Sequence, residues 1–124
     1  MSLLVYQAYG NLLRFERYLA SDDFRALYDR VRNHPLGRRG TAADIVERIC
    51  SAVDRAAIWY PKRVLCLQRS AATVCLLKAH GVRAQMVIGA QQMPFRAHAW
   101  VEVDEHVVND RPYMREIYQV LDRC

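Results

Sequence analysis

The sequence lacks the features that mark several protein classes. Its 124 residues include only five glycines and four prolines, with no low-complexity tract and no internal repeat, which argues against fibrous, disordered and repeat architectures. No apolar run reaches the length of a membrane span. The N-terminus also has no basic region before its apolar residues and no small-residue cleavage site. We therefore predict a cytoplasmic protein with no membrane span.

The cysteines and histidines show neither a disulfide framework nor a metal motif. No Cys-x-x-Cys pair occurs, and the four histidines fall in no zinc-ligand spacing. Without an export signal, reduced thiols are expected, and we predict neither a metal nor another cofactor. A mixed zinc site remains a minor alternative, and its ligands would be Cys66, His98, His106 and Asp110.

The positive charge is not concentrated. The net charge is +5, but the arginines are spread among acidic residues rather than gathered in one stripe. Nucleic-acid binding is therefore not predicted. An ordinary solvated surface is the favoured interpretation, with an acidic peptide partner as the alternative.

Apolar periodicity predicts three helices in the first half. The first should bury Leu12, Leu13, Tyr18 and Leu19. The second should begin after a capping Ser21 and bury Phe24, Leu27, Tyr28 and Val31. A loop is expected over 33–40. The third helix should be capped by Thr41, with Asp44 in a box-like position, and should end at 59–61. Its buried stripe should be Ile45, Ile49, Ala52, Val53 and Ala56.

The second half predicts one more helix followed by a sheet. The segment 66–81 reads as a helix closed by Gly81. Strands are expected over 82–89, 95–103, 106–110 and 116–121, with a loop over 90–94. Helices followed by strands predict an α+β fold in which the N-terminal helices and a Cys66-bearing helix pack on a small antiparallel sheet.

The segment 95–103 has strict alternation, which predicts one apolar face. That face should comprise Phe95, Ala97, Ala99, Val101 and Val103. The opposite, polar face should comprise Arg96, His98, Trp100 and Glu102. A hairpin onto 106–110 would then bring His98 and Asp110 to a common region, as a base and its orienting acid.

Cys66 is the candidate nucleophile. It stands at the predicted start of a helix, where unpaired N–H groups and the helix dipole favour the thiolate. Cys75 lies inside the same helix among apolar residues and reads as a small core side chain. Cys66, His98 and Asp110 are the three residue types that a cysteine peptidase needs.

Three stretches carry a resemblance to a known family. They are CLQRSAATVCLLKAHGV, VIGAQQMPFRAHAWVEVD and VVND. In these the chain resembles the leader peptidases of lasso peptide biosynthesis, in the transglutaminase-like cysteine protease superfamily. The resemblance implies a papain/transglutaminase-like fold, with Cys66 as nucleophile, His98 as base and Asp110 as orienting acid. We expect one domain over 1–124, with a helical part over 1–60 and the catalytic helix and sheet over 61–124.

The resemblance also implies the substrate and the partners. The substrate would be a lasso peptide precursor from which the leader is removed. The chain's shortness suggests the split form, served by a separate leader-binding RiPP recognition element protein and acting beside the lasso cyclase. The alternatives are a transglutaminase-like acyltransferase or amidase, and a noncatalytic peptide-binding module of the same fold.

Substrate contacts and the oxyanion site are less defined by the sequence. Trp100 and Trp59 are candidate substrate-binding residues, with simple packing as the alternative for Trp100. The Cys66 backbone N–H is a natural oxyanion donor. Candidates for a second donor are Gln68, Gln85 and Trp59.

Overall fold

The computed structural model describes residues 2–39 and 43–124 and confirms an α+β fold. Its helices are α1 (Leu3–Ala20), α2 (Phe24–Arg32), α3 (Ile45–Trp59), α4 (Cys66–Ala79) and the short α5 (Met114–Ile117). Its strands are β1 (Gln85–Gln92), β2 (Phe95–Val103), β3 (His106–Val107) and β4 (Gln119–Arg123). They form one antiparallel sheet in the order β3-β2-β1-β4.

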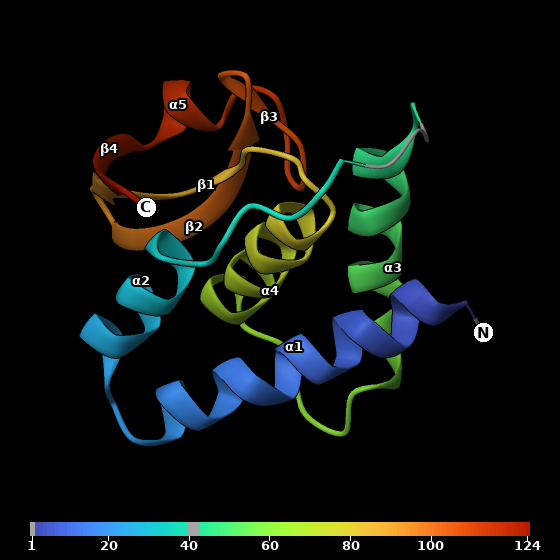
Figure 1. Cartoon of the computed structure of the whole chain (residues 1–124). Coiled ribbons are helices and arrows are strands. Elements are labelled where there is room, and N and C mark those ends of the chain that lie inside the picture. Colours follow the sequence, from blue (N-terminus) through green and yellow to red (C-terminus); the bar gives the residue numbers. More distant parts are fainter. Residues whose placement is uncertain (1, 40–42) are drawn as a thin grey trace.

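Helix α4 is the centre of the fold. Figure 1 shows it between the helices α1 and α3 on one side and the sheet on the other. Its residues from 70 to 77 are all buried, which is typical of a helix surrounded by protein on every side. Gly81 follows its last turn with a φ of 80°, so the predicted glycine C-terminus is confirmed.

The helix starts differ from the prediction in one place and lie outside the described residues in another. Asp23, not Ser21, caps α2, because its carboxylate accepts a hydrogen bond from the Ala26 N–H. Ser21 instead closes α1, donating its hydroxyl to the carbonyl of Arg17. The predicted cap at Thr41 lies outside the described residues. None of the described helices combines the length and the apolar character needed to cross a lipid bilayer.

The helical core is formed by the predicted stripes, with changes at the ends. All five predicted positions of α3 are buried. Helix α2 buries Leu27 and Val31, whereas Phe24 is 46% exposed. Of the positions predicted for α1, Leu12 is buried, Tyr18 and Leu19 are partly buried against the core, and Leu13 is exposed. The buried residues of α1 are Leu4, Val5, Ala8, Leu12 and Phe15.

The strand boundaries also need correction. β1 begins at Gln85 and continues through Gln92, so most of the loop predicted over 90–94 is strand, with a turn at 93–94. The predicted last strand over 116–121 starts as α5 and continues as β4. The side chain of Met114 explains this helical turn, since it is buried beside Val87 and Trp100.

The two faces of β2 do not divide into apolar and polar as predicted. Ala99 and Val101 are buried on one face, but Trp100 and Glu102 on the other face are buried too. The segment after β3 covers this second face, where a small core contains Val87, Trp100 and Met114. The sheet therefore has a core on each side, and His98 lies at the edge of the smaller one.

Candidate functional site

Cys66 occupies the first position of α4. The preceding Leu65 is extended, with φ −77° and ψ 154°, and its carbonyl accepts the first helical hydrogen bond from the Arg69 N–H at 2.9 Å. The N–H groups of Cys66, Leu67 and Gln68 therefore precede the helical hydrogen-bond ladder. The Cys66 thiol is half-buried and lies at the positive end of the α4 dipole.

His98 and Asp110 are joined by a direct hydrogen bond. The distance from His98 Nε2 to Asp110 Oδ2 is 2.7 Å, and each side chain is 27% exposed. This contact assigns Nε2 to the carboxylate and leaves Nδ1 as the ring nitrogen that can accept a proton. The imidazole is also stacked 5.5 Å from the ring of Tyr118 and 6.4 Å from that of Trp100, measured between centroids.

Asn109 ties this loop to the helix and to the sheet. Its Oδ1 accepts a hydrogen bond from the Val101 N–H at 2.7 Å, and its Nδ2 donates to Ser70 Oγ at 3.3 Å. Ser70 lies one turn after Cys66 and is buried. The sequence interpretation assigned no role to Asn109. Its position directly before Asp110 in the Val-Val-Asn-Asp run was the available signal.

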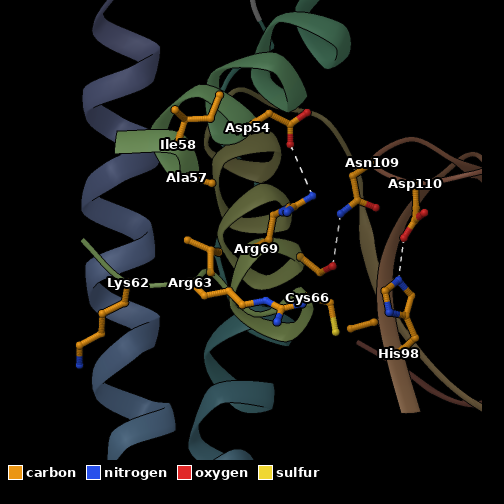
Figure 2. A pocket seen from close by; sticks show the side chains of 13 residues that line it. Asp54, Ala57, Ile58, Lys62, Arg63, Cys66, Arg69, His98, Asn109 and Asp110 are labelled. Carbon is orange, nitrogen blue, oxygen red and sulfur yellow. Dashed lines mark hydrogen bonds and ion pairs between the residues drawn. The ribbon is translucent and has the colours of Figure 1, made fainter. Parts of the chain in front are cut away.

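One pocket of about 590 Å³ contains all three predicted catalytic residues. Figure 2 shows Cys66 between α4 and the strand that carries His98, with Asp110 above the imidazole. Ser70 and Asn109 also line the pocket. The rest of the wall combines apolar residues with four charged ones, which are Asp54, Lys62, Arg63 and Arg69. The structure thus brings together a thiol, an imidazole and a carboxylate that are far apart in the sequence.

The two predicted tryptophan contacts do not lie in this pocket. Trp100 is completely buried in the smaller core, where its Nε1–H donates to Glu102 Oε2 at 2.9 Å. It therefore packs and does not wall the cleft. Trp59 is 67% exposed at the end of α3 but is not among the pocket residues.

The candidates for a second oxyanion donor are also elsewhere. Gln68 is buried and donates its amide to the Leu12 carbonyl at 2.8 Å, so it joins α4 to α1. Gln85 opens β1 next to a different hollow. Of the named donors, the Cys66 backbone N–H is the one that lies at the pocket.

The other cysteines occupy environments that disfavour a thiolate. Burial raises the pKa of Cys75 to about 11. Burial and the neighbouring Asp54 likewise raise the pKa of Cys50 to about 11. Cys124 is buried at the end of the sheet. Within 2–39 and 43–124, no three His, Cys, Asp or Glu side chains lie close enough to hold one metal ion, so the mixed zinc site has no support in the geometry.

Two comparisons with known proteins match the chain. A family model described as the transglutaminase-like superfamily matches residues 11–123. Over 56 residues the chain is 41% identical to the microcin J25-processing protein McjB of Escherichia coli. That alignment covers 45% of this chain and 27% of McjB, so the chain spans about a quarter of the length of this relative. No solved structure matches the chain.

Proposed function

Because the chain belongs to the transglutaminase-like superfamily, we propose that it is a cysteine endopeptidase that removes the leader from a lasso peptide precursor. The observation that carries the proposal is the 2.7 Å bond between His98 and Asp110 in the pocket lined by the helix-start thiol of Cys66. The name of the partial relative McjB describes the processing of a peptide. The motifs resembling lasso leader peptidases support the same substrate class.

The geometry supports a defined division of labour. His98 Nδ1 takes the proton from Cys66 Sγ, and the thiolate attacks the carbonyl carbon of the scissile bond. The backbone N–H of Cys66 then stabilises the oxyanion at the positive end of α4. His98 returns the proton to the leaving amine, which leaves a thioester on Cys66. Water hydrolyses this thioester with His98 again as base.

Asp110 acts on the imidazole and not on the substrate. The Asp110 carboxylate accepts a hydrogen bond from the His98 Nε2–H, which keeps Nδ1 free. The same contact stabilises the imidazolium that forms when Cys66 is deprotonated. Asn109 acts one step further out, because its bonds to Val101 and Ser70 hold the backbone that carries Asp110.

The partners follow from the same proposal. A separate leader-binding RiPP recognition element protein presents the precursor, and the lasso cyclase uses the amine that cleavage releases. Holding the leader on such a protein would raise the local concentration of the scissile bond near Cys66.

Cys66→Ala tests the proposal, with Cys50→Ala as a matched control because both thiols are half-buried in helices. A lasso precursor is incubated with each variant and with the leader-binding protein, and the products are weighed by mass spectrometry. We expect Cys66→Ala to abolish cleavage and Cys50→Ala to retain it. Cleavage by a folded Cys66→Ala variant would refute the assignment of Cys66 as the nucleophile. Transfer of the leader acyl group to an amine, in place of hydrolysis, would instead indicate an acyltransferase.

A further inference from the structure

A second hollow of about 310 Å³ also has Cys66 in its wall. Helix α2 provides part of its wall through Phe24 and Tyr28. The start of α4 and the strands β1 and β2 provide the rest, and Cys66 and His98 line both hollows. The apolar residues of this wall are Phe24, Tyr28, Leu67, Ile88, Ala97 and Ala99. We refer to this second hollow as the α2 pocket.

The two hollows differ sharply in chemistry. The charged pocket has Lys62, Arg63, Arg69 and Asp54 in its wall. In the described part of the chain, the α2 pocket has no ionisable side chains other than Cys66, His98 and Tyr28. Burial, reinforced by the nearby acidic groups of the C-terminal residues, raises the pKa of Tyr28 above its usual value. Its phenol therefore stays neutral, and the α2 pocket presents an apolar wall beside the nucleophile.

We propose that the α2 pocket binds the aliphatic or aromatic side chain of a substrate residue immediately flanking the scissile bond. This inference rests on the proposed peptidase function and adds a specificity to it. The precursor would thus be selected at the cut by an apolar residue, in addition to any recognition of its leader.

Continuity with the nucleophile is the main reason for this assignment. The scissile carbonyl must come within bonding reach of Cys66 Sγ, so the neighbouring substrate residues have to enter the hollows that adjoin it. One hollow mixes charged side chains with apolar ones such as Ile58 and Val64, whereas the wall of the other is almost entirely methyl groups and aromatic rings. A charged substrate side chain in the α2 pocket would lose water without gaining an ionic partner from Phe24, Leu67 or Ile88.

The exposure of Phe24 supports the same assignment. It is the first residue of α2 and is 46% exposed, although the helix stripe to which it belongs faces the core. An apolar substrate side chain would cover part of this ring and remove apolar surface from water. In a hydrophobic pocket, one methylene group changes the rate ratio by about tenfold or more. Preference for Leu over Ala should therefore be measurable.

A peptide panel tests the α2 pocket. Peptides spanning the cut carry Leu, Phe, Ala, Asp or Lys at each of the two positions on either side, and kcat/KM is measured with wild type, Phe24→Ala and Phe95→Ala. Phe95 is a matched control because it is 75% exposed and lies in neither hollow. We expect one position to favour Leu or Phe over Ala by roughly tenfold. Phe24→Ala should reduce that preference several-fold, and Phe95→Ala should leave it unchanged.

A second measurement separates this inference from the peptidase function. Cys66 is alkylated with iodoacetamide and with its N-benzyl derivative, and peptide mapping compares the rates with those at Cys50. In both reactions a carbon–sulfur bond forms, iodide leaves and the thiol proton passes to His98 or buffer. Relative to Cys50, Cys66 should react several-fold faster with the benzyl reagent than with iodoacetamide. This rate ratio should fall in Phe24→Ala.

The outcomes are distinct. If no peptide is cleaved but the benzyl preference depends on Phe24, the peptidase proposal fails, and the α2 pocket is supported as an apolar binding site beside Cys66 but not as a site for a residue at a scissile bond. If peptides are cleaved without an apolar preference, or if the two phenylalanine variants behave alike in both measurements, the assignment of the α2 pocket is overturned.

Discussion

Gly89→Ala should disturb the imidazole of His98, although Gly89 itself does not line the pocket that contains Cys66. Gly89 lies in β1 directly opposite His98 in the β1–β2 register. A methyl group added at Gly89 would lie 2.6 and 2.8 Å from two ring carbons of Trp100 and 2.8 Å from the Tyr118 Cβ. Relaxed carbon–carbon contacts are about 3.5–4.0 Å, so these neighbours would have to move by roughly 1 Å.

Neither neighbour can move easily. Trp100 is completely buried and its indole N–H is held by Glu102. The contact on Tyr118 is with its Cβ, which moves only with the backbone between α5 and β4. Overpacking of this kind costs about 1–3 kcal/mol. For a domain of this size we expect the Tm to fall by about 4 °C per kcal/mol.

Gly10→Ala is the matched control, with the opposite sign. Gly10 lies within α1, and a methyl group there would meet nothing within 4 Å. Since alanine is the better helix former, this change should stabilise the protein by about 0.5–1 kcal/mol. Both variants are unfolded with denaturant and followed by circular dichroism. If Gly89→Ala is as stable as wild type or as Gly10→Ala, the packing argument is refuted.

The same change has a functional consequence. The His98 ring is stacked on both Trp100 and Tyr118, so a shift of these rings changes the direction of Nδ1. We expect Gly89→Ala to lower kcat at a temperature where the variant is still fully folded. Wild-type kcat in a folded Gly89→Ala enzyme would show that the stacking does not orient the base.

Two further predictions concern groups around the site. Burial alone would raise the pKa of Glu102, but hydrogen bonds from Arg123 and Trp100 hold this pKa below its usual value. The ionised Glu102 therefore stabilises the fold fully above the unfolded-state pKa of about 4.3. This stabilisation is lost as the pH falls through the lower folded-state pKa. Glu102→Gln should lower the free energy of unfolding by about 1.5–3 kcal/mol at pH 7. In denaturant unfolding, the difference between the variant and wild type should shrink at acidic pH. A difference that stays constant with pH would contradict the role given to the Glu102 carboxylate. Asn109→Ala should lower the free energy of unfolding by about 1–3 kcal/mol, because the buried Val101 N–H loses its acceptor, and it should also lower kcat. Ser70→Ala should lower the free energy of unfolding by only about 1 kcal/mol. Equal effects of the two variants would contradict the role given to Asn109.

The parts that the sequence predicts well depend on local chemistry. The buried stripe of α3 repeats at helical spacing and has no competing apolar face, so periodicity identified all five positions. Gly81 is the residue that tolerates a φ of 80° after α4. The segment 66–81 predicts a helix with Cys66 at its start, and α4 does begin at Cys66.

Helix ends were harder because neighbouring polar residues compete for the same role. Ser21, Asp22 and Asp23 are three consecutive candidates for a cap. Their roles depend on where α1 stops, since Ser21 still bonds to the carbonyl of Arg17 and leaves Asp23 to start α2. A pattern of residue types does not determine that stopping point.

The second face of β2 was misread for a reason that lies outside the strand. Taken alone, the alternation of β2 predicts that Glu102 faces solvent. Its carboxylate is buried because Arg123, 21 residues further along the chain, donates to it at 2.7 Å. Trp100 provides a second donor from the strand itself. Only the return of the chain through α5 and β4 creates this environment, so alternation could not reveal it.

This misread face also determines how the candidate base is held. Asp110 fixes one nitrogen of His98, but a hydrogen bond at Nε2 still allows the ring to tilt about it. The stacked rings of Tyr118 and Trp100 restrict that tilt. Gly89 lets Trp100 lie close to the sheet, and Glu102 holds the indole there. The orientation of the His98 ring therefore depends on residues that contribute no chemistry of their own, and a motif search restricted to Cys66, His98 and Asp110 would miss them.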